Sequence, residues 1–552
     1  MKKTTFLIPA LSLLIFFFYL PLANLLGEGL WGINGFNPEP LVNLLTDPYY
    51  WNVISFTAKQ AIYSTVLSLV VGLPGAWILT RYEFRGRKLL RSLTAVPFVL
   101  PAITVVSGFL AFFGNNGFLN RGLMQLFALD TPPLRILYSL RGIVLAHAFY
   151  NAPIVTRVVE ARWADIDPSY EESAALSGAN VWQSFRKILL PLLAPGIAAS
   201  SALVFIFCFL SFPIVLALGG ARFSTLEVEI YTLVQTLGEY ELGAALALVE
   251  IFLSLTFTYF YLRMESFFSV ETLALRSRRR EKLFVGGMDL PKLLTLAYTL
   301  LAAVLFLGPL LGVFYRSFTA SGSMTLDWFR RLFLPGYHAL IGASPLRTIG
   351  NSLGFALGAA ILSAVIGTPL AYFLARARFR GRAIFDAVAM APLGVSSVAL
   401  GFAFSEGFVS GPIIKLPRPM VIIVAHSVLA YPFFIRAAVP ALSSLKREII
   451  ESARLAGANR WNLLWRIELP LIRKSLLAGL AFAFAISLGE MSATIMLVRP
   501  GLKTMPIAIY ELISAREFGT ASAMSVVLIS VVGLAFYIID RAGRDFFNRR
   551  KN

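Results

Sequence analysis

The chain has 552 residues, of which 57% are hydrophobic and 14% are charged. Water-soluble domains rarely have this composition, so we predict an integral membrane protein. The formal net charge of +19 would suit a nucleic-acid-binding protein, but the basic residues gather at the ends of apolar segments, as the positive-inside rule describes. A single cysteine, Cys208, excludes a disulfide framework.

Apolar segments of about 20 residues recur along the whole chain, and each is long enough to cross ~30 Å of hydrocarbon as a helix. Helices are required because no water is available there to hydrogen-bond an open backbone. We predict twelve spans, six in each half of the chain. They cover residues 6–26, 55–79, 90–113, 137–160, 195–219 and 243–263, and then 293–315, 350–375, 384–408, 419–440, 474–498 and 520–540. The first resembles a signal peptide, but its apolar stretch is too long for one and no convincing cleavage site follows.

Two polar segments, each lying between apolar spans, repeat one another. Residues 172–191 and 451–470 are 279 positions apart and agree at eleven of twenty aligned positions, where unrelated segments would agree at about one or two. In each copy a glycine follows the first glutamate by six residues, and a proline follows that glycine by thirteen. A membrane protein that keeps two such helix-forming inserts is predicted to offer both of them to a cytoplasmic partner.

The repeat extends over most of the chain. The counterpart of Pro97 is Pro392, 295 positions later, and the counterpart of His147 is His426, 279 positions later. The 16-residue difference falls between about residues 101 and 141, so the first half has a longer loop after its third span. An even number of spans gives both halves the same orientation, as in parallel repeats. We therefore predict an all-α membrane fold of two parallel six-helix repeats.

The basic residues orient the chain. The loop 27–54 contains no Lys or Arg, whereas 81–91, the connection 276–282 and the C-terminal tail from Arg541 are rich in them. The positive-inside rule then places these basic segments, both polar repeats and both termini on the cytoplasmic side. We predict a first repeat over residues 1–264, a basic cytoplasmic linker over 265–291 and a second repeat over 292–552.

The first polar segment has the sequence of two short helices joined by a turn. Asp167-Pro168 is a predicted helix start, because Asp accepts hydrogen bonds from exposed N–H groups and Pro is tolerated in the first turn. Gly178 is placed to end that helix in a left-handed cap, and a second helix over about 181–190 leads to Pro191. Small side chains at Ala174 and Gly178 leave a turn that sits closely against another surface. Ordinary solvated loops would also have caps, but two copies with matched spacing favour docking.

The pattern Glu-x-Ala-x-x-x-Gly, followed thirteen residues later by Pro, resembles the EAA loop of permease subunits of binding-protein-dependent ABC importers. In that family the loop forms a coupling helix that docks in a groove of a cytoplasmic ATPase. The resemblance implies two coupling loops here, over about 165–191 and 444–470, which would contact two copies of the ATPase. The implied docking residues are Glu172, Ala174 and Gly178 in the first loop and Glu451, Ala453 and Gly457 in the second, with Pro191 and Pro470 ending the loops. Both copies depart from the family at one position, where Ser173 and Ser452 replace the usual Ala.

The resemblance covers nearly the whole chain, and the fusion of two six-span halves is similar to the thiamine and ferric-iron permeases of this superfamily. Segments 144–153, 216–220 and 226–231 resemble the thiamine type more closely, while 489–494 and Arg499-Pro500 fit both types, so both substrates stay open. The resemblance implies a solute-binding protein outside the membrane and a place in the lipid bilayer of a prokaryotic inner or plasma membrane. The fifth and eleventh spans, which follow the coupling loops, are candidates for lining the pathway.

The sequence contains no P-loop, because no Gly-Lys dipeptide occurs in it. ATP is therefore expected to be used by a partner subunit, and we expect no catalytic residue, no metal and no cofactor in this chain, and no nucleic-acid partner. Two other functions compete with the permease interpretation. A twelve-span secondary transporter driven by an ion gradient would leave the paired loops unexplained. A multi-pass membrane enzyme would need a cluster of catalytic side chains, which three His and one Cys do not suggest.

Ionisable side chains within spans mark candidate functional positions, because a charge at membrane depth costs at least ~2.5–3.5 kcal/mol. Glu490 in the eleventh span is a candidate pathway residue for a cationic substrate, and the alternative is a structural hydrogen bond to a neighbouring helix. Its repeat counterpart is Ser211, so a site there would be asymmetric. Glu250 is predicted to pack or to interact near the cytoplasmic side. His147 and His426 occupy matched positions, which favours an inherited packing or hydrogen-bonding role over metal ligation.

Overall fold

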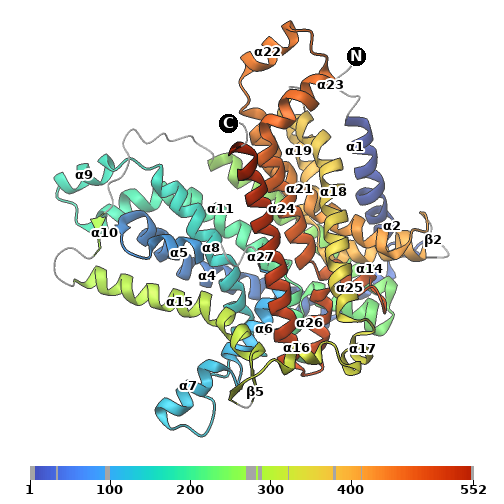
Figure 1. The fold of residues 1–552 in the computed structure, drawn as a ribbon, viewed down its shortest axis with the longest axis horizontal. Helices are drawn as coiled ribbons and strands as arrows, with labels where there is room; N and C mark the ends of the chain where they lie inside the picture. Colours follow the sequence, from blue (N-terminus) through green and yellow to red (C-terminus); the bar gives the residue numbers. More distant parts are fainter. Residues whose placement is uncertain are drawn as a thin grey trace. The chain divides into compact units, whose positions relative to one another are not determined.

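A computed structural model describes residues 7–32, 35–93, 100–268, 281–283, 289–320, 322–376, 381–411 and 413–548. Its regular structure is almost entirely helical (Figure 1). Among these residues, eleven helices are long and apolar enough to span a membrane, and twelve if the bent pair Ile384–Gly394 and Ser397–Ser410 counts as one span. The predicted all-α membrane fold is therefore confirmed. Pro97, most of the predicted linker and the tail from residue 549 lie outside the described residues.

The bounds of the elements follow the chain order. In the first half the spans are α1 (Leu7–Leu14) continued by α2 (Leu20–Glu28), α4 (Pro48–Arg81), α6 (Ala102–Phe113), α8 (Leu140–Ala164), α11 (Leu190–Phe209) and α14 (Tyr240–Phe268). In the second half they are α15 (Leu290–Ser317), α18 (Pro345–Arg376), α19 (Arg382–Met390) with α20 (Ser397–Phe404), α21 (Arg418–Ser443), α24 (Leu469–Gly489) and α27 (Phe518–Asn548).

Short elements connect the spans. The connecting helices are α3 (Glu39–Thr46), α5 (Arg87–Leu93), α7 (Phe118–Phe127), α9 (Ser169–Leu176), α10 (Val181–Ser184), α12 (Pro213–Leu218) and α13 (Leu226–Tyr231), then α16 (Asp327–Arg331), α17 (Pro335–Ile341), α22 (Arg447–Leu455), α23 (Arg460–Asn462), α25 (Ser492–Leu497) and α26 (Met505–Ser514). Two-residue strands pair as β1 (Trp31–Gly32) with β2 (Gly35–Phe36), β3 (Tyr82–Glu83) with β4 (Glu281–Lys282), and β5 (Thr319–Ala320) with β6 (Ser323–Met324).

The fifth and eleventh spans differ from their predicted form. We expected continuous helices over 195–219 and 474–498, but α11 ends at Phe209 and α24 ends at Gly489, and the short helices α12 and α25 follow. In the fifth span Pro213 begins the new helix, a position that proline tolerates because the N–H group it lacks would be unpaired there. In the eleventh span the break is made by Glu490, whose backbone is extended. Each of these two spans is therefore a long helix followed by a short one.

The helices group into two compact units. The first-half unit comprises Leu45–Glu229 and Phe252–Gly322, and the second-half unit comprises Met1–Leu44, Ile230–Ile251 and Ser323–Asn552. Each unit therefore contains the first span of the other half of the chain. In the first-half unit α15 packs against α6, and in the second-half unit α1 packs against α18. The predicted repeat boundaries concern the sequence and stay a prediction.

The two units are built alike, as a parallel repeat requires. In the first-half unit α8 packs against α4 and α11, and in the second-half unit the counterpart α21 packs against α18 and α24. A Cβ added to Gly72 would lie 2.6 Å from Val155 Cβ, and a Cβ added to the equivalent Gly367 would lie 2.6 Å from Phe434 Cδ1. Glycine is therefore needed at the same helix crossing in both units, because any side chain would separate the two helices. This match supports the internal repeat.

Candidate functional site

The two polar loops found in the sequence fold in the same way. Asp167 Oδ1 accepts a hydrogen bond from Ser169 N at 2.9 Å, so the predicted start of α9 is confirmed. The cap that follows α9 contains Gly178, which has a φ of +81°, and the cap that follows α22 contains the equivalent Gly457, which has a φ of +84°. Residues other than glycine rarely adopt this backbone conformation, which explains why both copies have glycine here. The predicted left-handed cap is present in each loop.

A pair of backbone hydrogen bonds closes each cap. Ala179 N donates to Ala174 O at 3.0 Å, and Gly178 N donates to Ala175 O at 3.0 Å. The second loop has the same two bonds, from Ala458 N to Ala453 O and from Gly457 N to Arg454 O, also at 3.0 Å. This is the Schellman arrangement, which satisfies carbonyl groups that a helix end leaves unpaired. Both loops are therefore preformed.

The first loop exposes large apolar side chains that have equivalents in the second loop. Leu176 is 90% exposed and its equivalent Leu455 is 91% exposed, the highest values among the large hydrophobic side chains of the described residues. Trp182 is 66% exposed and its equivalent Trp461 is 53% exposed. Exposed apolar side chains in matched positions indicate a surface that a partner covers. We did not predict these four residues as docking residues, although the repeat alignment shows both identities and would have identified them.

The docking residues that the resemblance implies lie on the same two loops. Glu172 and Glu451 are exposed on α9 and α22, and Ala174 lies on the buried face of α9. Ala453 is half-buried, and the two glycines are exposed at the caps. Their contact with an ATPase stays a prediction.

Pro191 and Pro470 do not end the loops as we expected. The helices run through them, over Trp182–Phe209 and Leu463–Gly489. A π-helical turn precedes each proline, at Phe185–Leu189 and at Leu463–Glu468, and its wider hydrogen-bond spacing accommodates the missing proline N–H and the proline ring.

Next to the second loop, an ion pair with a buried carboxylate joins α18 to the helix that leads into α24. The side chain of Glu468, the last residue of the π-helical turn, is 1% exposed and lies 3.0 Å from the Arg376 guanidinium at the end of α18. Arg454 in α22 also attracts the Glu468 carboxylate. The first repeat has Leu189 at this position, and its counterpart of Arg376 is Arg81. The second loop is therefore linked to α18 and α24 by charge, in a way that the first repeat does not reproduce.

Replacing Glu468 by glutamine is expected to lower the free energy of unfolding by about 1–3 kcal/mol, because Arg376 would lose its counter-ion. The smaller values apply because the Arg376 side chain is 26% exposed and water screens its charge. The double variant Glu468→Leu with Arg376→Leu, which copies the leucine of the first repeat, should recover most of the loss. Thermal unfolding of the purified protein in detergent measures both effects. If the double variant were no more stable than Glu468→Gln, the ion pair would not be the cause.

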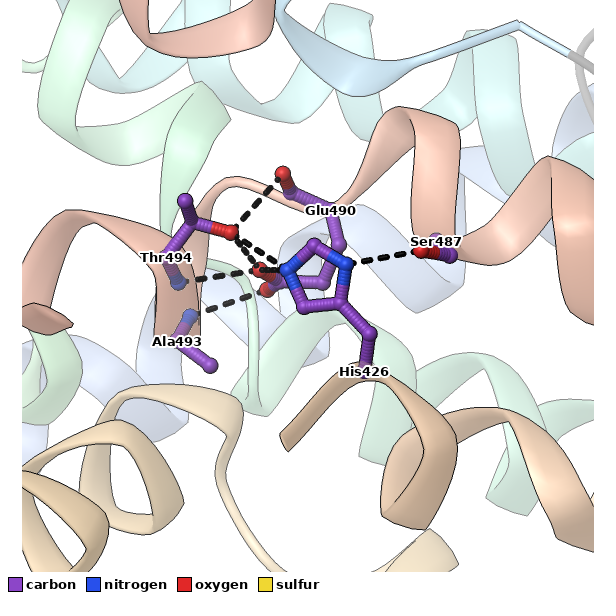
Figure 2. A network of polar contacts seen from close by, with 5 residues as sticks. All are labelled: His426, Ser487, Glu490, Ala493 and Thr494. Carbon is purple, nitrogen blue, oxygen red and sulfur yellow. Dashed lines mark hydrogen bonds and ion pairs between the residues drawn. The ribbon is translucent and has the colours of Figure 1, made fainter. Parts of the chain in front are cut away.

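Glu490 caps the short helix that follows the break in the eleventh span. Its carboxylate accepts hydrogen bonds from Ala493 N at 2.9 Å, from Thr494 N at 3.0 Å and from the Thr494 hydroxyl at 2.6 Å (Figure 2). These bonds satisfy N–H groups that the first turn of α25 leaves unpaired and place a negative charge at its positive end. The side chain is 7% exposed. A role of Glu490 in the translocation pathway stays a prediction.

His426 connects this cap to two helices. Its Nδ1 is 2.7 Å from Ser487 Oγ in α24, and its Nε2 is 2.7 Å from Thr494 Oγ1 in α25 (Figure 2). The same Nε2 is 3.5 Å from the Glu490 carboxylate. The histidine of α21 therefore holds the two pieces of the broken span in place, which is the hydrogen-bonding role that its matched position suggested.

In the first repeat, His147 likewise forms a hydrogen bond through each ring nitrogen, but one of its partners comes from a different helix. His147 Nε2 is 2.8 Å from Ser211 Oγ, at the break between α11 and α12, and His147 Nδ1 is 2.9 Å from Ser64 Oγ. The counterpart of Ser64 in the second repeat is Ala359, and the counterpart of Ser487 in the first repeat is Cys208. Each histidine thus keeps a serine on Nδ1, although the serine comes from a different helix. Glu490 replaces Ser211 and so brings a carboxylate to only one of the two breaks.

Glu250, the remaining acidic candidate within a span, is completely buried in the second-half unit. It lies beside Ser396, which caps the start of α20. This agrees with the packing role that we favoured for it.

We compared the chain with known protein families, relatives and solved structures. The family model for the binding-protein-dependent transport system inner membrane component matches residues 65–269 and 367–545. The ferric transport system permease protein FbpB of Actinobacillus pleuropneumoniae is 28% identical over 549 residues, or 96% of this chain and 77% of that protein. The thiamine transport system permease protein ThiP of Salmonella typhimurium is 26% identical over 518 residues, or 90% of this chain and 89% of that protein. A bacterial ABC transporter involved in the import of alginate has a TM-score of 0.42 at 20% identity, over 48% of this chain and 94% of that chain.

Proposed function

The chain belongs to the family of binding-protein-dependent transport system inner membrane components, and we propose that it works as the permease subunit of an ATP-driven importer in which one chain supplies both repeats. The observation that carries this proposal is the pair of preformed loops, each with an almost fully exposed leucine in the same position. Two equivalent surfaces suit two copies of one cytoplasmic ATPase. Both chain termini would then lie in the cytoplasm with the loops.

The loops would pass movement of the ATPase to the membrane. Each loop leads into a helix without a break, over Trp182–Phe209 and Leu463–Gly489. A displacement of either loop would therefore move a rigid rod whose far end is the break held by His147 or His426. Alternating access by rigid movement of helix bundles around such breaks is a known mode of transport. The short helices α12 and α25 would respond at the outer side of the pathway.

We propose a cationic solute as the substrate, either thiamine or ferric iron. The relatives named above include permeases of both transport systems. A separate binding protein would deliver the solute to the outer side, and ATP would be hydrolysed by the partner ATPase. Glu490, and Ser211 at the equivalent break, are the residues that we propose beside the pathway.

Transport by the complex is expected to require ATP and both loops. We would reconstitute the chain with its ATPase and binding protein in liposomes and measure uptake of labelled thiamine or Fe(III). Uptake should depend on internal ATP and persist with a protonophore. The variant Gly178→Asp with Gly457→Asp should lose uptake, because aspartate disfavours the positive φ at both caps and adds charge to both docking surfaces. Uptake without ATP that a protonophore abolishes would contradict the proposal and favour a secondary transporter.

A further inference from the structure

Three arginines gather at the end of the second-half unit that lies opposite the coupling loop. The loop 498–504 joins α25 to α26, so it lies at the far end of the eleventh span from α22 (Figure 1). Arg499 is exposed on this loop. Arg418, at the start of α21, is close enough for the two charges to repel each other. The guanidinium of Arg347, at the start of α18, covers Gly501: its Nη2 lies 3.3 Å from where a glycine Cβ would be. We call these three residues the arginine cluster.

The loop that carries Arg499 is held firmly. Gly501 N donates to Gly342 O at 3.1 Å. The Asn351 side-chain amide donates to Gly501 O at 3.0 Å and to Lys503 O at 3.1 Å. Arg418 Nη1 donates to Leu497 O at 3.0 Å, just before the loop. These bonds fix the backbone beneath the arginine cluster, so its charges are presented in a set arrangement.

The arginine cluster has an uncompensated charge. Neither Arg347 nor Arg499 forms an ion pair with a residue that the structure describes. The neighbouring cation Lys503, in contrast, lies 2.6 Å from a Glu511 carboxylate oxygen and is neutralised. Because these like charges are held close together without a counter-charge, this end of the unit has a positive electrostatic potential. An acidic partner would relieve their repulsion.

The internal repeat provides a comparison that shows whether the fold requires these charges. The register at this end is fixed by one hydrogen bond that both repeats keep: Leu226 N donates to Thr57 Oγ1 at 3.1 Å, and the equivalent Met505 N donates to Ser352 Oγ at 2.8 Å. In that register the first-repeat counterparts of Arg347, Arg418 and Arg499 are Asn52, Ser139 and Gly220. The first repeat builds the same elements with no charge at any of the three positions. Arg418 holds the backbone at Leu497, but folding does not explain the charges of Arg347 and Arg499.

We propose that the arginine cluster is the docking site for an acidic surface of the solute-binding protein, an inference that rests on the function proposed above. Arg347 and Arg499 are exposed, and a small anion held at such an open surface would be strongly screened by water and salt. A protein partner adds buried area to the charge contacts and excludes water from them. The two repeats are otherwise similar at this end, so a cluster present on only one of them would also determine which way round the partner binds.

The test compares binding of the solute-binding protein to wild type and to the variant Arg347→Glu with Arg499→Glu. Arg418 is left unchanged because it holds the backbone at Leu497. We would measure Kd with the permease–ATPase complex in nanodiscs at ~50 mM and ~300 mM salt. The wild-type affinity should fall as salt rises, and the variant should bind about tenfold or more weakly at the lower salt. The control Arg330→Glu with Arg516→Glu makes the same charge change in the same unit and should bind within about twofold of wild type.

Each outcome decides one question. Basal ATPase activity of the assembled complex shows whether the variant is folded, and Arg347→Gln with Arg499→Gln serves as the milder version. If wild type binds and the variant binds equally well at both salt concentrations, the arginine cluster is not the docking site. If inorganic phosphate stabilises wild type but not the variant against heat, while the partner affinity is unchanged, the cluster is a small-anion site and the proposal is overturned. If no binding protein engages wild type or stimulates its ATPase activity, the proposed importer function fails instead.

Discussion

Replacing Leu176 and Leu455 by aspartate is expected to abolish assembly with the cytoplasmic ATPase and to leave the membrane fold intact. Both side chains are about nine-tenths exposed, so the protein alone gains little stability from them. Burial of a leucine at an interface stabilises it by ~1.5–3 kcal/mol, and a buried aspartate would add an unpaired charge. The dissociation constant of the complex should therefore rise by about 100-fold or more. Changing only one of the two leucines should raise the dissociation constant less, because the contact at the other loop still holds the ATPase.

Co-purification of the ATPase with the permease, followed by titration of labelled ATPase, measures this loss. Leu176→Met with Leu455→Met keeps the apolar contact and should assemble like wild type. Leu237→Asp, at a leucine that is 62% exposed away from the loops, should also assemble normally and controls for an added charge. Normal assembly of the doubly aspartate-substituted protein would show that the exposed leucines are not docking residues. The coupling assignment would then have to rest on other positions of α9 and α22.

Replacing Glu490 by alanine is expected to lower both the stability of the folded protein and its rate of transport. The carboxylate accepts three hydrogen bonds at the start of α25, and loss of a charged cap costs ~1–3 kcal/mol. The short helix would then be less well fixed to α24 and His426, and uptake in liposomes should fall by about tenfold or more. Glu490→Ser copies Ser211 of the first repeat and should recover part of the stability, because a hydroxyl still accepts from an N–H group.

The variant Glu490→Gln separates the cap from a pathway role. Glutamine keeps the size of the side chain and one acceptor oxygen but removes the charge. If capping is the main role, Glu490→Gln should lie between wild type and Glu490→Ala in both thermal stability and uptake. A Glu490→Gln protein with the stability of wild type and no uptake would show that the charge meets the cation directly.

Local features of the fold were predictable from the sequence because short-range chemistry determines them. Asp167 at the start of α9 and the glycines at the two caps follow from the needs of helix ends. The apolar spans follow from the lack of water in the hydrocarbon. The break at Glu490 could not be predicted in this way, since two non-helical residues hardly change the hydropathy of a 25-residue segment. Its cap depends on which N–H groups the carboxylate meets in three dimensions.

The candidate site was predictable only in part. The repeat alignment located both loops, but the residues that the family resemblance implies include the buried Ala174 and leave out Leu176, whose large apolar side chain is 90% exposed. The arginine cluster needs residues from α18, α21 and the loop after α25, which are far apart in the sequence. No local pattern indicates that Arg347 lies on Gly501. The ion pair of Glu468 with Arg376 could not be predicted for the same reason, because the two residues lie on different helices and are 92 positions apart.

The exchange of first spans between the two units has a consequence for how the protein is made. α1 and α2 leave the ribosome well before α18, against which α1 packs, because α18 begins roughly 320 residues after α2 ends. At a synthesis rate of about 5–20 residues per second, the first span must wait on the order of tens of seconds for its neighbour. During that time the first span lacks the helix it packs against, and the first-half unit is incomplete until α15 has entered the membrane. Neither half of the chain can therefore finish its own bundle, and a chain cut between α14 and α15 would yield two fragments that must find each other in the bilayer.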